Sequence, residues 1–208
     1  SQHIGTPANP VVNKGDTVKT GQVIAAGKGF VSANIHSSVS GKVNKIDLAA
    51  DCNGFKQNAI FIDVVGDEWI DTIDRSSKIV REIRLSPEEI IKRCFESGIV
   101  GLGGATFPSH VKLTVPSGKK CDVLIINGVE CEPYLTSDHR LMLEKGEEIL
   151  TGVTILMKAL KVEKALIGIE NNKPDAIAHL TKLASTFNGI AVCPLKLKYP
   201  QGAEKQLI

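Results

Sequence analysis

The chain has 208 residues, 42% of them hydrophobic and 23% charged, which is enough to bury the core of one or two globular domains. Its 25 basic and 23 acidic residues leave a net charge of +2, and the absence of a basic or aromatic stripe argues against nucleic acid as a partner. No apolar stretch reaches the roughly 20 residues of a transmembrane helix, and the N-terminal SQHIGTPANP lacks the features of a signal peptide. We therefore expect a soluble, cytoplasmic chain with no membrane span.

The five cysteines do not show the spacing of a disulfide framework or a metal site. They are odd in number, scattered, and never spaced as CxxC, so neither disulfides nor a zinc or iron–sulfur site is expected in this chain. We expect reduced, mostly buried thiols at Cys52, Cys94, Cys121, Cys131 and Cys193.

Residues 10–65 predict an all-β domain. Short apolar pieces alternate with the turn signals NKGD, KTGQ, AAGKG, VSGK and DCNG, as in a small barrel or sandwich. The stretches GDTVKTGQVIA and IHSSVSGKVNKI resemble the biotinyl/lipoyl-type barrel-sandwich hybrid fold. Phe30 stands where the carrier versions of that fold have their modified lysine, and Lys28 nearby lies between two glycines. We expect a carrier fold without a covalently attached group.

Residues 67–85 are charged and irregular, which favours a connector with one added strand. A helix is predicted next, over SPEEIIKRCFESG. Ser86 is its N-cap, Pro87 its first residue, Glu89 the partner in a capping box, and Gly98 its stop.

The rest of the chain alternates strands with helices. Apolar runs predict strands over 122–126, 164–169 and 190–194, and helical spacing predicts helices over 138–160 and 174–187. This order indicates a mainly parallel sheet with crossover helices. The expected fold class is mixed α/β in two domains, with a β domain over 1–66, a connector over 67–85 and an α/β domain over 86–208.

The segment GLGGATFPSHVKL, residues 101–113, places three glycines in four positions. Such bare backbone can lie against something flat or anionic, such as a cofactor ring or a phosphate, although an ordinary glycine-rich turn is the alternative. The usual dinucleotide fingerprint does not fit, because the loop follows a helix and runs into a proline.

A second segment, INGVECEPYLTSDHR at residues 126–140, begins where a strand ends, the place where open α/β sheets bind ligands. Glu130 and Glu132 precede a proline, so the backbone is expected to be extended with both side chains on the same side. Neither acid has a partner at metal-ligand spacing, so no metal and no paired acid–base catalysis are expected. Hydrogen bonding to ribose hydroxyls or to a ring N–H fits better than the alternative, a solvated acidic turn.

The two segments, together with the C-terminal YPQGAEKQLI, the N-terminal SQHIG and the β domain, resemble the RnfC family across the whole chain. Its members are the NADH-handling subunits of Rnf complexes, which are membrane-bound ferredoxin:NAD oxidoreductases coupled to ion translocation. The motifs resemble more distantly the flavin-carrying, NADH-binding subunit of respiratory complex I. The resemblance implies a complex I flavin-subunit-like α/β domain.

In the complex I relative, the glycine loop and the acidic segment line one pocket for FMN, with NADH stacked over the flavin. The resemblance implies that Gly101, Gly103 and Gly104 let the backbone approach the flavin or nucleotide. It also implies that Phe107 stacks on a ring of NADH and that Lys112 neutralises the FMN phosphate.

The same resemblance gives roles to the acidic segment. Asn127 and Glu130 would bond the polar edge and ribityl chain of the flavin, and Glu132 would bind hydroxyls of NADH. Val129 stands where the complex I version has another acid. A third motif on the far side of the pocket would contribute Tyr199, Gly202 and Glu204.

The implied chemistry is hydride transfer between nicotinamide C4 and flavin N5, with no catalytic protein residue. The implied cofactors are FMN and NAD(H), and two 4Fe–4S clusters are expected only in sequence beyond this chain. The implied partners are NADH, the other Rnf subunits and ferredoxin, at the cytoplasmic face of the bacterial membrane. The alternative is a non-catalytic scaffold or carrier-like module that docks partner subunits.

Overall fold

A computed structural model describes residues 2–51, 54–102 and 104–208, so the predicted site residue Gly103 and the predicted thiol Cys52 lie outside the described residues. The chain forms two compact units that alternate along the sequence. The first is Ser1–Ser77 with Ile91–Thr114, and the second is Lys78–Ile90 with Val115–Ile208. Residues 91–114, which the sequence boundary at 86 assigns to the α/β domain, therefore group with the N-terminal unit. The mixed α/β class is confirmed.

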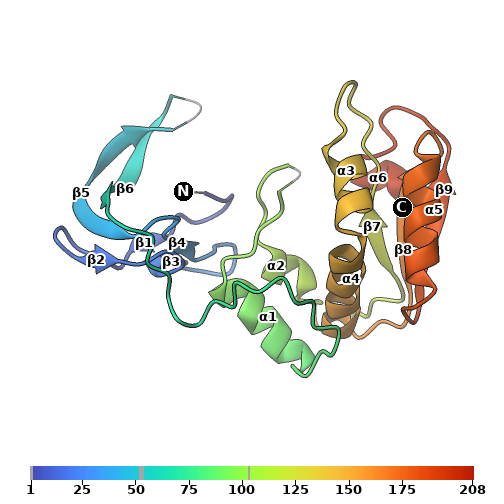
Figure 1. The fold of residues 1–208 in the computed structure, drawn as a ribbon, viewed down its shortest axis with the longest axis horizontal. Helices are drawn as coiled ribbons and strands as arrows, with labels where there is room; N and C mark the ends of the chain where they lie inside the picture. Colours follow the sequence, from blue (N-terminus) through green and yellow to red (C-terminus); the bar gives the residue numbers. More distant parts are fainter. Residues whose placement is uncertain (1, 52–53, 103) are drawn as a thin grey trace. The chain divides into compact units, whose positions relative to one another are not determined.

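The first unit contains two small antiparallel sheets (Figure 1). One has the order β1-β3-β4 and the other β2-β5-β6. Their core is built from Val12, Val18, Ile24 and Val43, with Ile35, Ile60 and Ile62 packed against it. The strands are β1 (Asn9–Pro10), β2 (Thr17–Val18), β3 (Val23–Ala26), β4 (Ile35–His36), β5 (Gly41–Ala50) and β6 (Lys56–Val64).

The connector over 67–85 forms less β-pairing than its sequence predicts. Trp69 makes an isolated parallel bridge to Thr20, and the described part of 67–85 holds no strand. Charged side chains in this segment offer no alternating apolar face that a full strand could bury. The added strand predicted here is therefore wrong.

Helix α1 (Pro87–Glu96) begins as its sequence predicts. The Ser86 N–H donates to the Glu89 carboxylate at 2.7 Å, and the Glu89 N–H donates to the Ser86 hydroxyl at 3.2 Å. The capping box is thus confirmed on both sides, and it satisfies two donors that the first turn of a helix leaves without intrahelical partners.

Gly98 is the stop signal just beyond the end of this helix, as predicted. The Gly98 N–H donates to the Phe95 carbonyl and the Ile99 N–H to the Cys94 carbonyl, both at 3.0 Å, which is the Schellman pattern. Gly98 has a φ of 65°, and an added Cβ would lie 2.3 Å from the Asn34 carbonyl oxygen. Only glycine satisfies both the backbone conformation and this close approach.

The second unit contains the predicted parallel sheet, with strands in the order β7-β8-β9 (Figure 1). Helices α3, α4 and α5 pack on one another and share a core with the sheet. Ile167, Ile169 and Leu150 are fully buried in that core. The elements are β7 (Leu124–Asn127), α3 (Ser137–Glu144), α4 (Gly146–Leu160), β8 (Ala165–Glu170), α5 (Pro174–Ala184), β9 (Ile190–Leu195) and α6 (Glu204–Leu207).

The single helix predicted over 138–160 is two helices. The backbone leaves helical geometry at Lys145, with φ −128° and ψ 27°, before α4 starts at Gly146. A Cβ on Gly146 would lie 2.7 Å from the Leu183 side chain of α5, so the chain approaches α5 closely where it bends. The bend lets Met142 of α3 and Leu150 of α4 both reach the core, a tertiary requirement that helical periodicity does not encode.

Candidate functional site

The glycine-rich segment forms a closed loop in the first unit. The Gly101 N–H donates to the Phe107 carbonyl at 2.9 Å, and Val100 makes an antiparallel bridge to Pro108. The loop leads into the short helix α2 (Ser109–Leu113), which the sequence analysis did not predict. Pro108, whose fixed φ suits a helix start, was the available signal.

The described glycines of this loop are not required by the fold. A Cβ on Gly104 would meet nothing within 4 Å, and one on Gly101 would meet the Phe107 backbone no closer than 3.8 Å. Neither glycine has a φ in the left-handed region, whereas Thr106 in the same loop has a φ of 52°. A plain turn would place its glycine where the backbone needs one. The open backbone at Gly104 therefore favours a surface that something else approaches.

Phe107 and Lys112 lie together beside this loop. The Lys112 ammonium is 5.9 Å from the centre of the Phe107 ring, at the outer range of a cation–π contact. Lys112 is exposed and Phe107 is half-buried. The loop thus combines bare backbone, an aromatic face and one cation, the set that a phosphate-bearing flat molecule would use.

His110 anchors helix α2 and was missed by the sequence analysis. Its ring is buried, its Nε2 lies 2.9 Å from the Phe30 carbonyl, and its ring centre is 5.0 Å from that of Phe95. An N–H at Nε2 that donates to this carbonyl leaves Nδ1 as an acceptor, and Nδ1 is buried with no hydrogen-bond partner among the residues that the structure describes. A lone histidine carries no sequence signal for this role.

The acidic segment lies at the carboxyl end of β7 in the second unit. Glu130 is buried, and its carboxylate accepts the Asp138 N–H at 2.9 Å, the His139 N–H at 3.3 Å and the Ser137 hydroxyl at 3.1 Å. Glu130 therefore caps the start of helix α3. Desolvation raises the pKa of its carboxyl, but these donors outweigh that effect and leave the pKa below its usual value.

Glu130 and Glu132 do not point the same way, so that expectation is wrong. Glu130 is 7% exposed, whereas Glu132 is exposed. The chain turns at Pro133, with the Leu135 N–H donating to the Glu132 carbonyl at 3.3 Å, and so it does not continue as a strand. Within the described part of the chain, no hydrogen bond or ion pair engages the Glu132 carboxylate. Its oxygens remain available to a ligand.

Asn127 joins the third motif to the acidic segment. Its Nδ2 donates to the Gly202 carbonyl at 2.8 Å, and its Oδ1 accepts the Val129 N–H at 3.1 Å. A Cβ on Gly202 would lie 3.4 Å from the Cys131 sulfur, so Gly202 packs against the segment directly. Tyr199 is 71% exposed, and Glu204 is exposed at the first position of α6.

A buried ion pair supports the same sheet edge and was also missed. The Lys173 ammonium lies 2.8 Å from the Glu170 carboxylate, with side-chain exposures of 7% and 0%. The Glu130 N–H points to the same Glu170 oxygen at 3.4 Å. The other Glu170 oxygen is buried and has no hydrogen-bond partner within the described ranges. The terminal glutamate of a predicted strand was the available signal, because β7 and β8 are parallel and end at one edge.

The predicted site residues thus fall into two groups, each described within its own unit. Gly101, Gly104, Phe107 and Lys112 belong to the first unit, and Asn127, Glu130, Glu132, Tyr199, Gly202 and Glu204 to the second. Within the first group, Phe107 contacts Gly101 and Lys112, and within the second, Asn127 contacts Gly202. The binding roles assigned to all of these residues stay predictions. Across residues 2–51, 54–102 and 104–208, no cluster of three or more His, Cys, Asp or Glu side chains could hold a metal ion, and no helix is long and apolar enough to cross a membrane.

Two family models match the chain. The RnfC barrel-sandwich hybrid domain matches residues 1–67, and the Nuo51 FMN-binding domain matches residues 94–208. The second match includes both the glycine loop and the acidic segment.

Curated relatives match the whole chain. One from the proton-translocating ferredoxin:NAD(+) oxidoreductase complex of Clostridium ljungdahlii is 53% identical over 210 residues, covering all of this chain and 45% of the relative. Its counterpart in the Na(+)-translocating complex of Acetobacterium woodii is 47% identical, with 46% of it covered. The counterpart in the ion-translocating oxidoreductase complex of Rhodobacter capsulatus is 44% identical, with 40% of it covered. The chain spans less than half the length of these relatives. A solved structure of an NAD+-reducing [NiFe]-hydrogenase is 20% identical over 59% of this chain and 23% of that one, with a TM-score of 0.47.

Proposed function

The chain belongs to the RnfC family, whose members are subunits of ion-translocating ferredoxin:NAD(+) oxidoreductase complexes, and from this premise we propose that it binds FMN and NAD(H) for hydride exchange between them. When bound, FMN supplies the ring that accepts or returns the hydride, and the chain supplies position and electrostatics. No side chain of the protein acts as a nucleophile or as a proton donor in this proposal.

The observation that carries the proposal is the open backbone at Gly104. A Cβ at Gly104 would project into space where the fold places nothing within 4 Å, and that is where a flat ring or a phosphate can approach the amides. Lys112 beside Phe107 adds the positive charge that a phosphate requires. These residues fit the phosphate-bearing part of FMN.

The acidic segment fits the sugar of the dinucleotide. Glu130 is occupied in capping α3, which positions the segment, while the exposed Glu132 carboxylate is available to accept ribose hydroxyls. Asn127 holds Gly202 against this segment and retains one amide hydrogen for a ligand. We assign NAD(H) contact to Glu132 and a supporting role to Glu130 and Asn127, with Tyr199 and Glu204 as further contacts from the third motif.

The remaining assignments follow from family membership. We propose that the first unit is a barrel-sandwich hybrid domain, that the chain works with the other subunits of an Rnf complex, and that ferredoxin is the electron partner of that complex. We place it at the cytoplasmic face of the bacterial membrane as a peripheral part. Two 4Fe–4S clusters would be held by sequence beyond residues 1–208.

A fluorescence titration tests the proposal. FMN added to the protein should lose fluorescence with saturation, and NADH should then bleach the visible absorption of the bound flavin. If FMN fluorescence is quenched on binding but NADH does not bleach the absorption of the bound flavin, the proposed hydride exchange is contradicted. If FMN fluorescence shows no saturable change, the second candidate, a scaffold that docks partner subunits without flavin, takes its place.

A further inference from the structure

Tyr134 occupies a turn position that normally belongs to glycine. Glu132, Pro133, Tyr134 and Leu135 form a β-turn closed by the Leu135 N–H and the Glu132 carbonyl at 3.3 Å. Tyr134 is the third residue of this turn and has a φ of 68°. Proline at the second position and a left-handed third residue are the features of a type II turn, whose third position favours Gly or Asn.

The tyrosine makes this turn less stable than a glycine or an asparagine would. A side chain at a left-handed position is unfavourable, because its Cβ crowds the following carbonyl oxygen. Bulky residues with positive φ are outliers for this reason. Some compensating interaction should therefore involve the ring.

Nothing in the described residues supplies that compensation. The Tyr134 side chain is fully exposed, with a relative exposure of 101%. In the part of the chain that the structure describes, no hydrogen bond and no ring contact involves it, whereas Phe30 and Phe95 both contact the His110 ring. An exposed large aromatic residue in a strained turn points to a ligand or a partner outside the chain.

We propose that Tyr134 is a stacking platform for a base of NAD(H), the base attached to the ribose that Glu132 holds. This inference rests on the function proposed above. The turn places Tyr134 two residues after Glu132, whose carboxylate is exposed and unpaired among the described residues. Aromatic faces stack on any base without needing hydrogen-bond readout, which suits a residue whose hydroxyl has no hydrogen bond within the described part of the chain.

The test is NADH affinity in the FMN-loaded full-length protein, measured by calorimetry on Tyr134→Asn, Tyr134→Phe and wild type. Asn relieves the backbone strain and removes the ring, so NADH should bind about five- to a hundredfold more weakly, as expected for one lost base–aromatic stack. The thermal midpoint should rise by about 2–4 °C. Tyr134→Phe keeps the ring and should bind NADH as wild type does. ADP-ribose and reduced nicotinamide mononucleotide, titrated separately, show which of the two bases stacks, since only the probe carrying that base should lose affinity.

Lys161→Asn is the matched control. Lys161 also has positive φ, at 58°, and lies in the same unit at the end of α4, where its exposed ion pair with Glu88 contributes little. It should gain stability without any change in NADH affinity. Equal NADH binding by wild type and Tyr134→Asn would overturn the inference. If Tyr134→Asn in that case also fails to assemble with other subunits, the ring makes a protein contact instead. If wild type itself binds no NADH, the proposed function is contradicted, and so is the inference that rests on it.

Discussion

Lys112 in the first unit and Glu132 in the second are exposed charges, and the proposal gives them opposite chemical tasks. Lys112 has its ammonium near the Phe107 ring, and Glu132 has no partner among the described residues. A lysine suits a phosphate as a point charge, and a carboxylate accepts hydroxyl protons. Because each is a surface side chain, its replacement should change binding without changing the fold.

We expect Lys112→Ala to weaken FMN binding about ten- to a hundredfold, since a charge-assisted hydrogen bond is worth roughly 1.5–3 kcal/mol, and the loss should be larger at low salt. NADH affinity of the flavin-loaded protein should stay near wild type. The measurement is FMN fluorescence titration at two salt concentrations. Lys14→Ala, an exposed lysine of the same unit, is the control and should bind FMN normally. Equal losses in the two variants would show a nonspecific charge effect.

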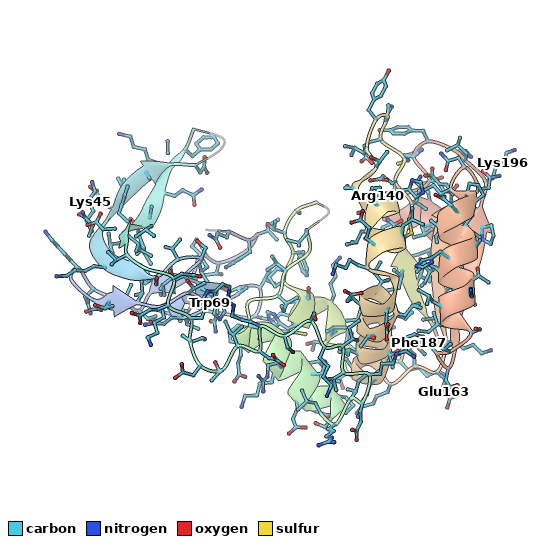
Figure 2. All side chains as sticks on the ribbon, in the orientation of Figure 1. Lys45, Trp69, Arg140, Glu163, Phe187 and Lys196 are labelled. Atoms are coloured by element: carbon cyan, nitrogen blue, oxygen red, sulfur yellow. The ribbon has the colours of Figure 1, made fainter. Side chains whose placement is uncertain are left out.

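Glu132→Gln should have the converse effect, because an amide accepts ribose hydroxyls less well than a carboxylate. FMN should stay bound while NADH affinity falls, as measured by bleaching of bound flavin at increasing NADH. Glu163→Gln is the control. Glu163 precedes β8 and so lies at the edge of the sheet opposite the acidic segment (Figure 2). Loss of FMN binding in Glu132→Gln would contradict the separate roles.

Gly104→Val tests whether the loop is a contact surface. The new side chain would meet no protein atom within 4 Å of its Cβ, so thermal stability should be unchanged, while FMN or NADH binding should be abolished. Gly152→Val, at a glycine of α4 with the same open surroundings, should leave binding intact. If Gly104→Val unfolds the protein, the loop is a structural turn.

At the scale of elements, helix α3 depends on a carboxylate from outside the helix. Glu130 accepts two backbone N–H groups from its first turn, and the Lys173 charge also favours the ionised form of Glu130. Arg140 and Glu144 form an ion pair on the same helix (Figure 2 labels Arg140). That exposed pair contributes little, so the capping carboxylate is the more important charge.

Glu130→Gln should destabilise the protein at neutral pH by about 1–2 kcal/mol, the range for a lost cap and its helix-dipole interaction. Because folding lowers the pKa of Glu130, its ionised form stabilises the folded state at pH values above 4.5, the ordinary pKa of the group. This stabilisation is lost as the pH falls through the lowered pKa of the folded protein. The difference between wild type and variant should therefore shrink in acid. Urea unfolding followed by circular dichroism at several pH values measures this. A difference that stays constant with pH would contradict the capping role.

At the scale of the whole molecule, the chain crosses between its units in the middle of helix α1. Ser86 and Glu89 begin the helix in the second unit, and Gly98 ends it in the first. His110, in the helix that follows the glycine loop, is hydrogen-bonded to the Phe30 carbonyl of the β domain. The position that carries a modified lysine in carrier proteins thus has a structural task here.

We therefore expect no biotinyl or lipoyl group on the protein. Phe30 cannot be modified, and its carbonyl accepts the His110 hydrogen bond. Intact mass after native expression should equal the mass of the unmodified sequence. An adduct on Lys28, located by peptide mapping, would contradict this interpretation and return the β domain to a carrier role.

The sequence alone determined the features that local chemistry specifies. The capping box at Ser86 and Glu89, the Gly98 stop and the strand–helix alternation each depend on residues close in the chain, and all are confirmed. The glycine loop was found in the same way, and its binding role stays a prediction. Family motifs also identified the acidic segment.

Only the tertiary structure decided which residues distant in the sequence contact one another and which side chains are buried. Glu130 turns inward because α3 folds back over it, and Glu132 is left outside. The buried Glu170–Lys173 pair, the break at Lys145 and the His110 anchor also arise from packing between separate segments. Periodicity and motifs report a residue's neighbours along the chain, whereas burial and hydrogen-bond partners depend on segments that meet only in the folded molecule.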